Sequence, residues 1–189
     1  MASSSGALPR AACVAFAGRC ALRLQPGFLS WAEAPPEHFG GLHRATVLVL
    51  QFSAAQGEVK DEPGLGTFVE EALEDAKASQ QDALIAEDAE LIEQTSRAVA
   101  AAEGVLCALR AAASTNSMDA ARWAAKAALL AVDSAARTQV ATGDQEPNTS
   151  TAQALSVEYR RLRDAAARHS WSDSTPVPVD FFGESPFEL

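Results

Sequence analysis

The sequence predicts an all-α protein: a single helical bundle or orthogonal array of five to six helices with a partly docked, irregular C-terminal tail. Alanine pairs and triplets recur through residues 98–136, separated by Leu, Val, Arg and Trp. Alanine has the highest helix propensity and lets helices approach closely. Residues 46–52 would also suit a buried strand by propensity, but no second strand candidate exists to pair with them. Helix is therefore the prediction there too.

Length and composition indicate one domain. The chain has 189 residues, of which 48% are hydrophobic and 21% charged, as in an ordinary globular protein. No apolar run reaches the ~18 residues of a membrane span, so we expect a soluble protein. We divide the chain into a flexible N-terminal tail (1–7), a helical domain (8–170) and a tail rich in Pro and aromatic residues (171–189).

The formal charge is −10 at pH 7, which argues against nucleic acid and anionic membranes as partners. The acidic residues concentrate in residues 58–93, where only two lysines oppose them. A solvated helix face accounts for such a stretch, and the alternative is a docking surface for a basic partner protein. Under that alternative the candidate partner-binding residues are Glu70, Glu71, Glu74 and Asp75.

The three cysteines, Cys13, Cys20 and Cys107, have neither an even count nor the paired spacing of a disulfide framework or a zinc site. On one helix Cys13 and Cys20 would be roughly 10 Å apart, too far for a disulfide. We therefore expect small core hydrophobes and a reducing, cytoplasmic compartment.

Start and stop signals divide the first half of the chain. A first helix follows Pro9 and ends at Pro26, and a second begins at the prolines 35 and 36 and ends at Gly57. Thr67 and Glu70 match a capping box, which predicts the start of a third helix. Its inward side would carry Phe68, Val69, Ala72, Leu73 and Ala76.

The next helix has the most regular pattern, a heptad stripe of Ile85, Ile92, Val99, Leu106 and Ala113 with a second stripe beside it. Such a stripe predicts burial in an antiparallel bundle, and it would equally suit a homodimer interface. Asn116 or Ser117 is expected to cap a fifth helix, which we place centrally because it is apolar on two sides. One of these sides consists of Met118, Ala121, Ala125, Leu129, Val132 and Ala136, and the other of Trp123, Ala127 and Leu130.

Ser150 and Gln153 match a capping box for a sixth helix. Its inward residues would be Leu155, Tyr159, Leu162 and Ala166, and its other face carries arginines. The tail after Ser170 has too many prolines for a helix, yet its aromatic residues predict that part of it packs on the bundle.

No residues have the spacing of a reactive site. His38 and His43 are five residues apart, whereas a helical zinc pair needs four, and no Glu-x-x-His element suits a di-iron site. Gly64-Leu65-Gly66 lacks the lysine of a phosphate loop. We therefore expect no metal and no cofactor. The carboxylate pairs of the third helix could in principle hold a cation or share a proton.

Two segments resemble known families. Leu8-Pro9-Arg10, Phe16-Ala17-Gly18-Arg19-Cys20 and Ala124-Ala125-Lys126-Ala127-Ala128 resemble all-helical immunity proteins associated with bacterial polymorphic toxins, over about residues 8–140. The repeated histidines of that family are missing here, so the resemblance transfers no site. The segment Asp173-Ser174-Thr175-Pro176-Val177-Pro178-Val179-Asp180-Phe181-Phe182-Gly183 is similar to the closing segment of uncharacterised, Ala-rich bacterial helical proteins.

The function predicted from the sequence is that of a non-catalytic helical protein that acts through protein–protein interaction. One alternative, implied by the resemblance, is an immunity protein that neutralises a cognate bacterial toxin. The other is an enzyme with a site near His38 and His43.

Overall fold

The computed structural model describes residues 8–54, 64–142 and 149–182, and these contain no strand. The prediction of an all-α fold is confirmed, with six helices in the described part of the chain. They are α1 (Arg10–Leu29), α2 (Pro36–Ala54), α3 (Leu65–Ala86), α4 (Ala89–Ala113), α5 (Ser117–Thr142) and α6 (Thr149–Arg168), followed by the 3₁₀ helix η1 (Val179–Phe182). The expected tail at residues 1–7 and the stop signal at Gly57 lie outside the described residues.

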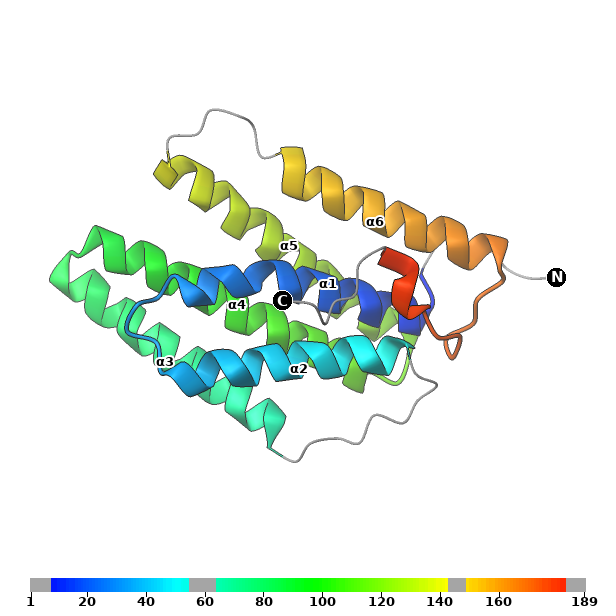
Figure 1. Ribbon diagram of the computed structural model, residues 1–189, viewed down its shortest axis with the longest axis horizontal. Coiled ribbons are helices and arrows are strands. Elements are labelled where there is room, and N and C mark those ends of the chain that lie inside the picture. Colours follow the sequence, from blue (N-terminus) through cyan, green and yellow to red (C-terminus); the bar gives the residue numbers. More distant parts are fainter. Residues whose placement is uncertain (1–7, 55–63, 143–148, 183–189) are drawn as a thin grey trace.

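Helix α1 occupies the middle of the bundle, in contact with α2, α4, α5 and α6. Figure 1 shows α4 between α3 and α5, with α1 and α2 in front of α4 and α6 running along α5. Close packing around α1 depends on small side chains, because most of its core positions are Ala, Gly or Cys. The prediction that the fifth helix is central is therefore wrong.

Helix α1 does not end at Pro26, as predicted, but continues to Leu29. Proline removes one backbone hydrogen bond inside a helix. The extra turn places Phe28, which is 1% exposed, against the ring of Trp31 at 5.7 Å between centroids. We attribute the extension to this burial, which offsets the missing hydrogen bond.

Helix α3 begins two residues before the predicted Thr67. Gly64, with φ of 91°, precedes the helix, and the Phe68 N–H donates to the Gly64 carbonyl at 2.9 Å. Thr67 is exposed inside the first turn, so the expected capping box is absent. The earlier start buries Leu65, which the capping pattern did not take into account.

The predicted fourth helix is interrupted at Glu87, which has φ of 56° and ends α3. The Asp88 side chain then accepts from the Leu91 N–H at 3.0 Å and caps α4. Ile85 therefore belongs to α3 and is 73% exposed. The core side of α4 carries the second stripe, with Ala98 and Val105 fully buried.

Helix α5 is capped by Asn116, whose Oδ1 accepts from the Asp119 N–H at 2.9 Å. Its predicted apolar stripe is wrong, because Met118 and Leu129 are 78% and 63% exposed. The buried positions are four alanines: Ala120, Ala124, Ala127 and Ala131. Short methyl groups let α5 approach α1 and α4 closely, which larger side chains would prevent.

Helix α6 buries Leu155, Leu162 and Ala166 as predicted, while Ser150 lies outside the described side chains. The prediction that Tyr159 points inward is wrong, because Tyr159 is 37% exposed and its neighbour Glu158 is buried instead. The following tail packs on the bundle, as expected. Val177 is 2% exposed and its N–H donates to the Ser53 carbonyl at 2.9 Å.

Candidate functional site

All four candidate carboxylates lie on α3 and are exposed to solvent, as the sequence predicted. They do not form one cluster. Glu70 and Glu74 line a hollow whose opposite wall is α5. Asp75 instead faces α2, and the Glu71 carboxylate makes no ion pair or hydrogen bond within the described part of the chain.

Three of these carboxylates have a basic neighbour. Glu74 Oε1 lies 3.2 Å from Lys77 Nζ, and Glu70 Oε1 lies 4.0 Å from a guanidinium nitrogen of Arg110. Asp75 Oδ2 lies 3.6 Å from His38 Nε2. The Glu70 and Glu74 pairs join exposed groups, and such ion pairs contribute about 0–1 kcal/mol, so little free energy opposes their exchange for contacts with a partner.

The hollow beside Glu70 and Glu74 has a volume of about 350 Å³ and is bounded by α3, α4 and α5. We call it the Cys107 hollow. Apolar side chains and the cysteine lie among charged side chains of both signs. Its lining consists of Glu70, Leu73, Glu74, Lys77, Glu103, Leu106, Cys107, Arg110 and Lys126.

The thiol of Cys107 is buried, and desolvation raises its pKa above the ordinary value of 9.0. The charges of Lys126 and Arg110 act in the opposite direction but are outweighed. Because the thiolate is the nucleophilic form of cysteine, Cys107 stays protonated and unreactive at neutral pH.

Two cations on the wall of the Cys107 hollow differ in how they are held. The Arg110 guanidinium lies over the ring of Trp123, 5.0 Å from its centroid. This contact, together with Glu70, restrains Arg110. The Lys126 ammonium makes no hydrogen bond or ion pair to any residue that the structure describes.

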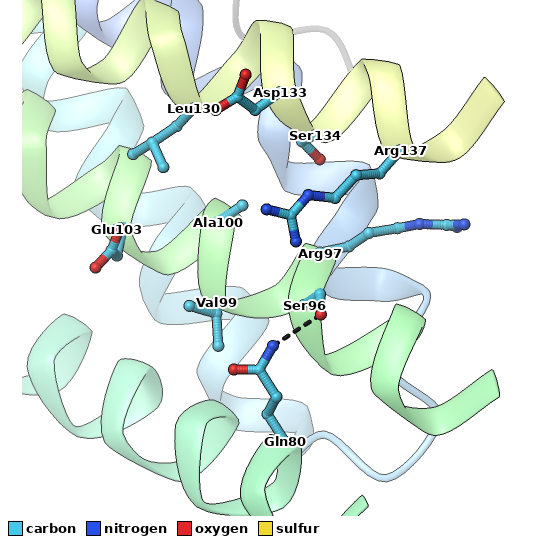
Figure 2. A pocket seen from close by; sticks show the side chains of 10 residues that line it. All are labelled: Gln80, Ser96, Arg97, Val99, Ala100, Glu103, Leu130, Asp133, Ser134 and Arg137. Carbon is cyan, nitrogen blue, oxygen red and sulfur yellow. Dashed lines mark hydrogen bonds between the residues drawn. The ribbon is translucent and has the colours of Figure 1, made fainter. Parts of the chain in front are cut away.

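A second hollow, of about 260 Å³, lies further along the same side of α4 (Figure 2). We call it the Arg137 hollow, and it shares Glu103 with the Cys107 hollow. Together they form a groove along α4 between α3 and α5. Val99 and Leu106 of the predicted heptad stripe line this groove, which explains why the stripe is only partly covered within one chain.

His38 and His43 do not share a site. The His38 ring is 7% exposed and packs edge-on against Phe68 of α3, with 5.5 Å between centroids. The His43 ring lies on the side of α2 that faces α1, with Nδ1 3.1 Å from Gln25 Oε1. Gln25 also donates to Thr46 Oγ1 at 2.8 Å, so His43 belongs to a hydrogen-bonded contact between α1 and α2.

Within the described ranges, no group of three His, Cys, Asp or Glu side chains is arranged to hold a metal ion. Nor does any helix in these ranges have the length and apolar character that crossing a membrane requires.

Sequence reasoning missed the groove residues Glu103, Lys126 and Arg137. A signal was present for Glu103 only, because charged residues at positions 93, 97, 103 and 110 accompany the heptad stripe. An apolar stripe with that many charged neighbours on the same helix is not expected to be fully buried. The prediction of burial rests on the apolar members of the stripe alone.

Comparisons of this chain with protein-family models, with curated proteins and with solved structures found no match.

Proposed function

We propose that this protein acts by binding a partner protein through the acidic side of α3. The observation that carries the proposal is the charge of this region. Residues 64–93 contain nine acidic residues and one lysine, and the four carboxylates of the candidate site are all exposed. A surface of one sign attracts partners of the opposite sign and raises their rate of association.

A partner protein with a basic surface would fit these four carboxylates. Lysine or arginine side chains can displace the weak ion pairs of Glu70 and Glu74, and the exposed carboxylates of Glu71 and Asp75 can accept further ones. The floor of the adjacent Cys107 hollow includes Leu73 and Leu106, which are 5% and 9% exposed and add a small apolar area to the contact. Carboxylates beside such an apolar floor are an arrangement found where a polar rim surrounds the core of an interface.

The test is capture of partners by the full-length protein, followed by quantitative mass spectrometry. The test variant has Glu70, Glu71, Glu74 and Asp75 all changed to Gln. The control has the same change in charge at exposed acids elsewhere: Glu33→Gln, Glu37→Gln, Asp119→Asn and Asp164→Asn. Far-ultraviolet circular dichroism and melting temperatures establish that both variants fold.

We expect at least one specific partner whose recovery falls about tenfold with the test variant, a loss of ~1.4 kcal/mol in binding, and stays unchanged with the control. Identical partner lists from the wild type and the test variant would remove the acidic side of α3 from the function. Equal losses with both variants would show a general charge effect and reject the proposed surface.

A further inference from the structure

The Arg137 hollow contains an arginine that nothing in the described structure neutralises. Figure 2 shows the Arg137 side chain extending from α5 into the space above α4, beside Ala100 and Ser96. Its guanidinium makes no hydrogen bond or ion pair with the described residues. Asp133, one turn earlier on α5, points another way (Figure 2).

The second arginine of this hollow is already paired. Arg97 Nε lies 2.9 Å from Glu93 Oε1, and its side chain runs away from the hollow (Figure 2). Arg137 therefore supplies the positive charge that is directed inward. A guanidinium has five N–H donors in a fixed fork, which matches the two oxygens of a carboxylate.

Neutral groups beside Arg137 can complete such a site. Gln80 Nε2 donates one hydrogen to Ser96 Oγ at 2.7 Å, and Ser96 in turn donates to the Ile92 carbonyl at 2.6 Å. The second hydrogen of the Gln80 amide has no acceptor among the described residues. It is available to an anionic oxygen that enters the hollow.

We propose that the Arg137 hollow binds a small aliphatic carboxylate, with its anionic group on the Arg137 guanidinium and its hydrocarbon part against Val99, Ala100 and Leu130. The lining favours a monoanion, because Glu103 and Asp133 repel a phosphate dianion more strongly. The volume of about 260 Å³ favours a ligand of few atoms. This site shares Glu103 with the Cys107 hollow but includes none of the four carboxylates of the proposed partner surface.

The test is a titration of the ¹⁵N-labelled full chain with sodium isovalerate at constant ionic strength, followed at the backbone amides of Ser96 and Ala100. We expect shifts at these amides that saturate, and binding about tenfold or more weaker in Arg137→Gln. Arg122→Gln is the matched control, because Arg122 is an exposed arginine of α5 outside the hollow. Neither change affects a buried side chain, so both variants should fold.

Three further probes test the chemistry of the ligand. Acetate should bind more weakly than isovalerate, by up to about fourfold for each carbon that becomes buried. Leu130→Ala should weaken isovalerate while leaving acetate unchanged. Equal binding of the neutral isoamyl alcohol or of inorganic phosphate would overturn the proposal. So would wild-type binding by Arg137→Gln, or unshifted Ser96 and Ala100 amides at millimolar isovalerate.

Discussion

Arg23 of α1 holds Glu158 of α6 by two hydrogen bonds, from its two terminal nitrogens to the two carboxylate oxygens at 2.6 and 2.9 Å. Glu158 is 8% exposed, and Arg19 donates to the same carboxylate at 3.3 Å. The Arg19 guanidinium also lies over the ring of Phe182, 5.0 Å from its centroid. A single carboxylate therefore joins the central helix, the sixth helix and the docked tail.

Removal of Glu158 should destabilise the protein more than an ordinary surface substitution. Glu158→Ala leaves two arginines without their partner, and we expect a loss of about 2 kcal/mol in the free energy of unfolding. This is below the 3–5 kcal/mol typical of fully buried pairs, because Arg23 is partly exposed. Urea denaturation measures the loss.

A double-mutant cycle with Arg23→Ala isolates the interaction from other effects of each substitution. A coupling free energy near zero would contradict the importance given to this pair.

Gly104 lets α4 approach α1. A Cβ atom at this position would collide with Leu24 Cδ1 and come within 3.9 Å of Ala21 Cα. We expect Gly104→Ala to destabilise the protein by about 1–2 kcal/mol, although alanine is the better helix former. Thermal unfolding measures the change.

Gly40→Ala on α2 is the matched control, because a Cβ atom there would have no neighbour within 4 Å. We expect it to be neutral or to stabilise by up to ~1 kcal/mol. If Gly104→Ala and Gly40→Ala change the stability by the same amount, close packing at Gly104 is not the cause of the change.

The buried thiols of α1 predict a loss of stability at alkaline pH. Burial raises the pKa of Cys13 to about 11 and that of Cys20 to about 12, from ordinary values of 9.0. Above pH 9 the unfolded chain releases these protons while the folded protein retains them. The free energy of unfolding should therefore be unaffected by these thiols below pH 9 and fall above it, by about 1.4 kcal/mol per pH unit for each thiol.

Urea denaturation between pH 8 and pH 10.5, in reducing buffer, measures this slope. Cys20→Ala should remove about half of what the two α1 thiols contribute above pH 9, while Cys107, whose pKa is also raised by burial, contributes in both proteins. An unchanged slope in this variant would assign the alkaline effect to other groups.

Val177 anchors the tail to the end of α2. Val177→Ala removes buried surface and should lower the free energy of unfolding by about 1 kcal/mol. The Val177 N–H, which donates to Ser53, should then exchange faster with deuterium. Val47→Ala, at a half-buried position of α2, is a control that should leave exchange in the tail unchanged.

Local patterns predicted the helices well where local chemistry decides the outcome. The cap at Asn116, the outward carboxylates of α3 and the docking of the tail agree with the structure. Predictions failed where packing contacts in the folded protein decide where a helix begins or ends. Pro26 is tolerated because Phe28 packs beyond it, and Thr67 does not cap α3 because Leu65 is drawn into the core.

The candidate site was predictable only in part. Glu70 and Glu74 were recognised from their charge and helical spacing. Lys126 and Arg137 were not, because nothing local indicates which side of α5 will face α4 across the groove.

Alanine content and the periodicity of apolar residues, both local properties of the chain, determined that this protein is all-α and that α3 is acidic on its outer side. Tertiary structure alone decided that α1 is central, that the heptad stripe of α4 lines a groove, and that Glu158 is buried against Arg23. The physical reason is that propensity and charge act within a few residues along the chain. Burial depends on which helices pack together, and that is settled by the fit of all of them at once.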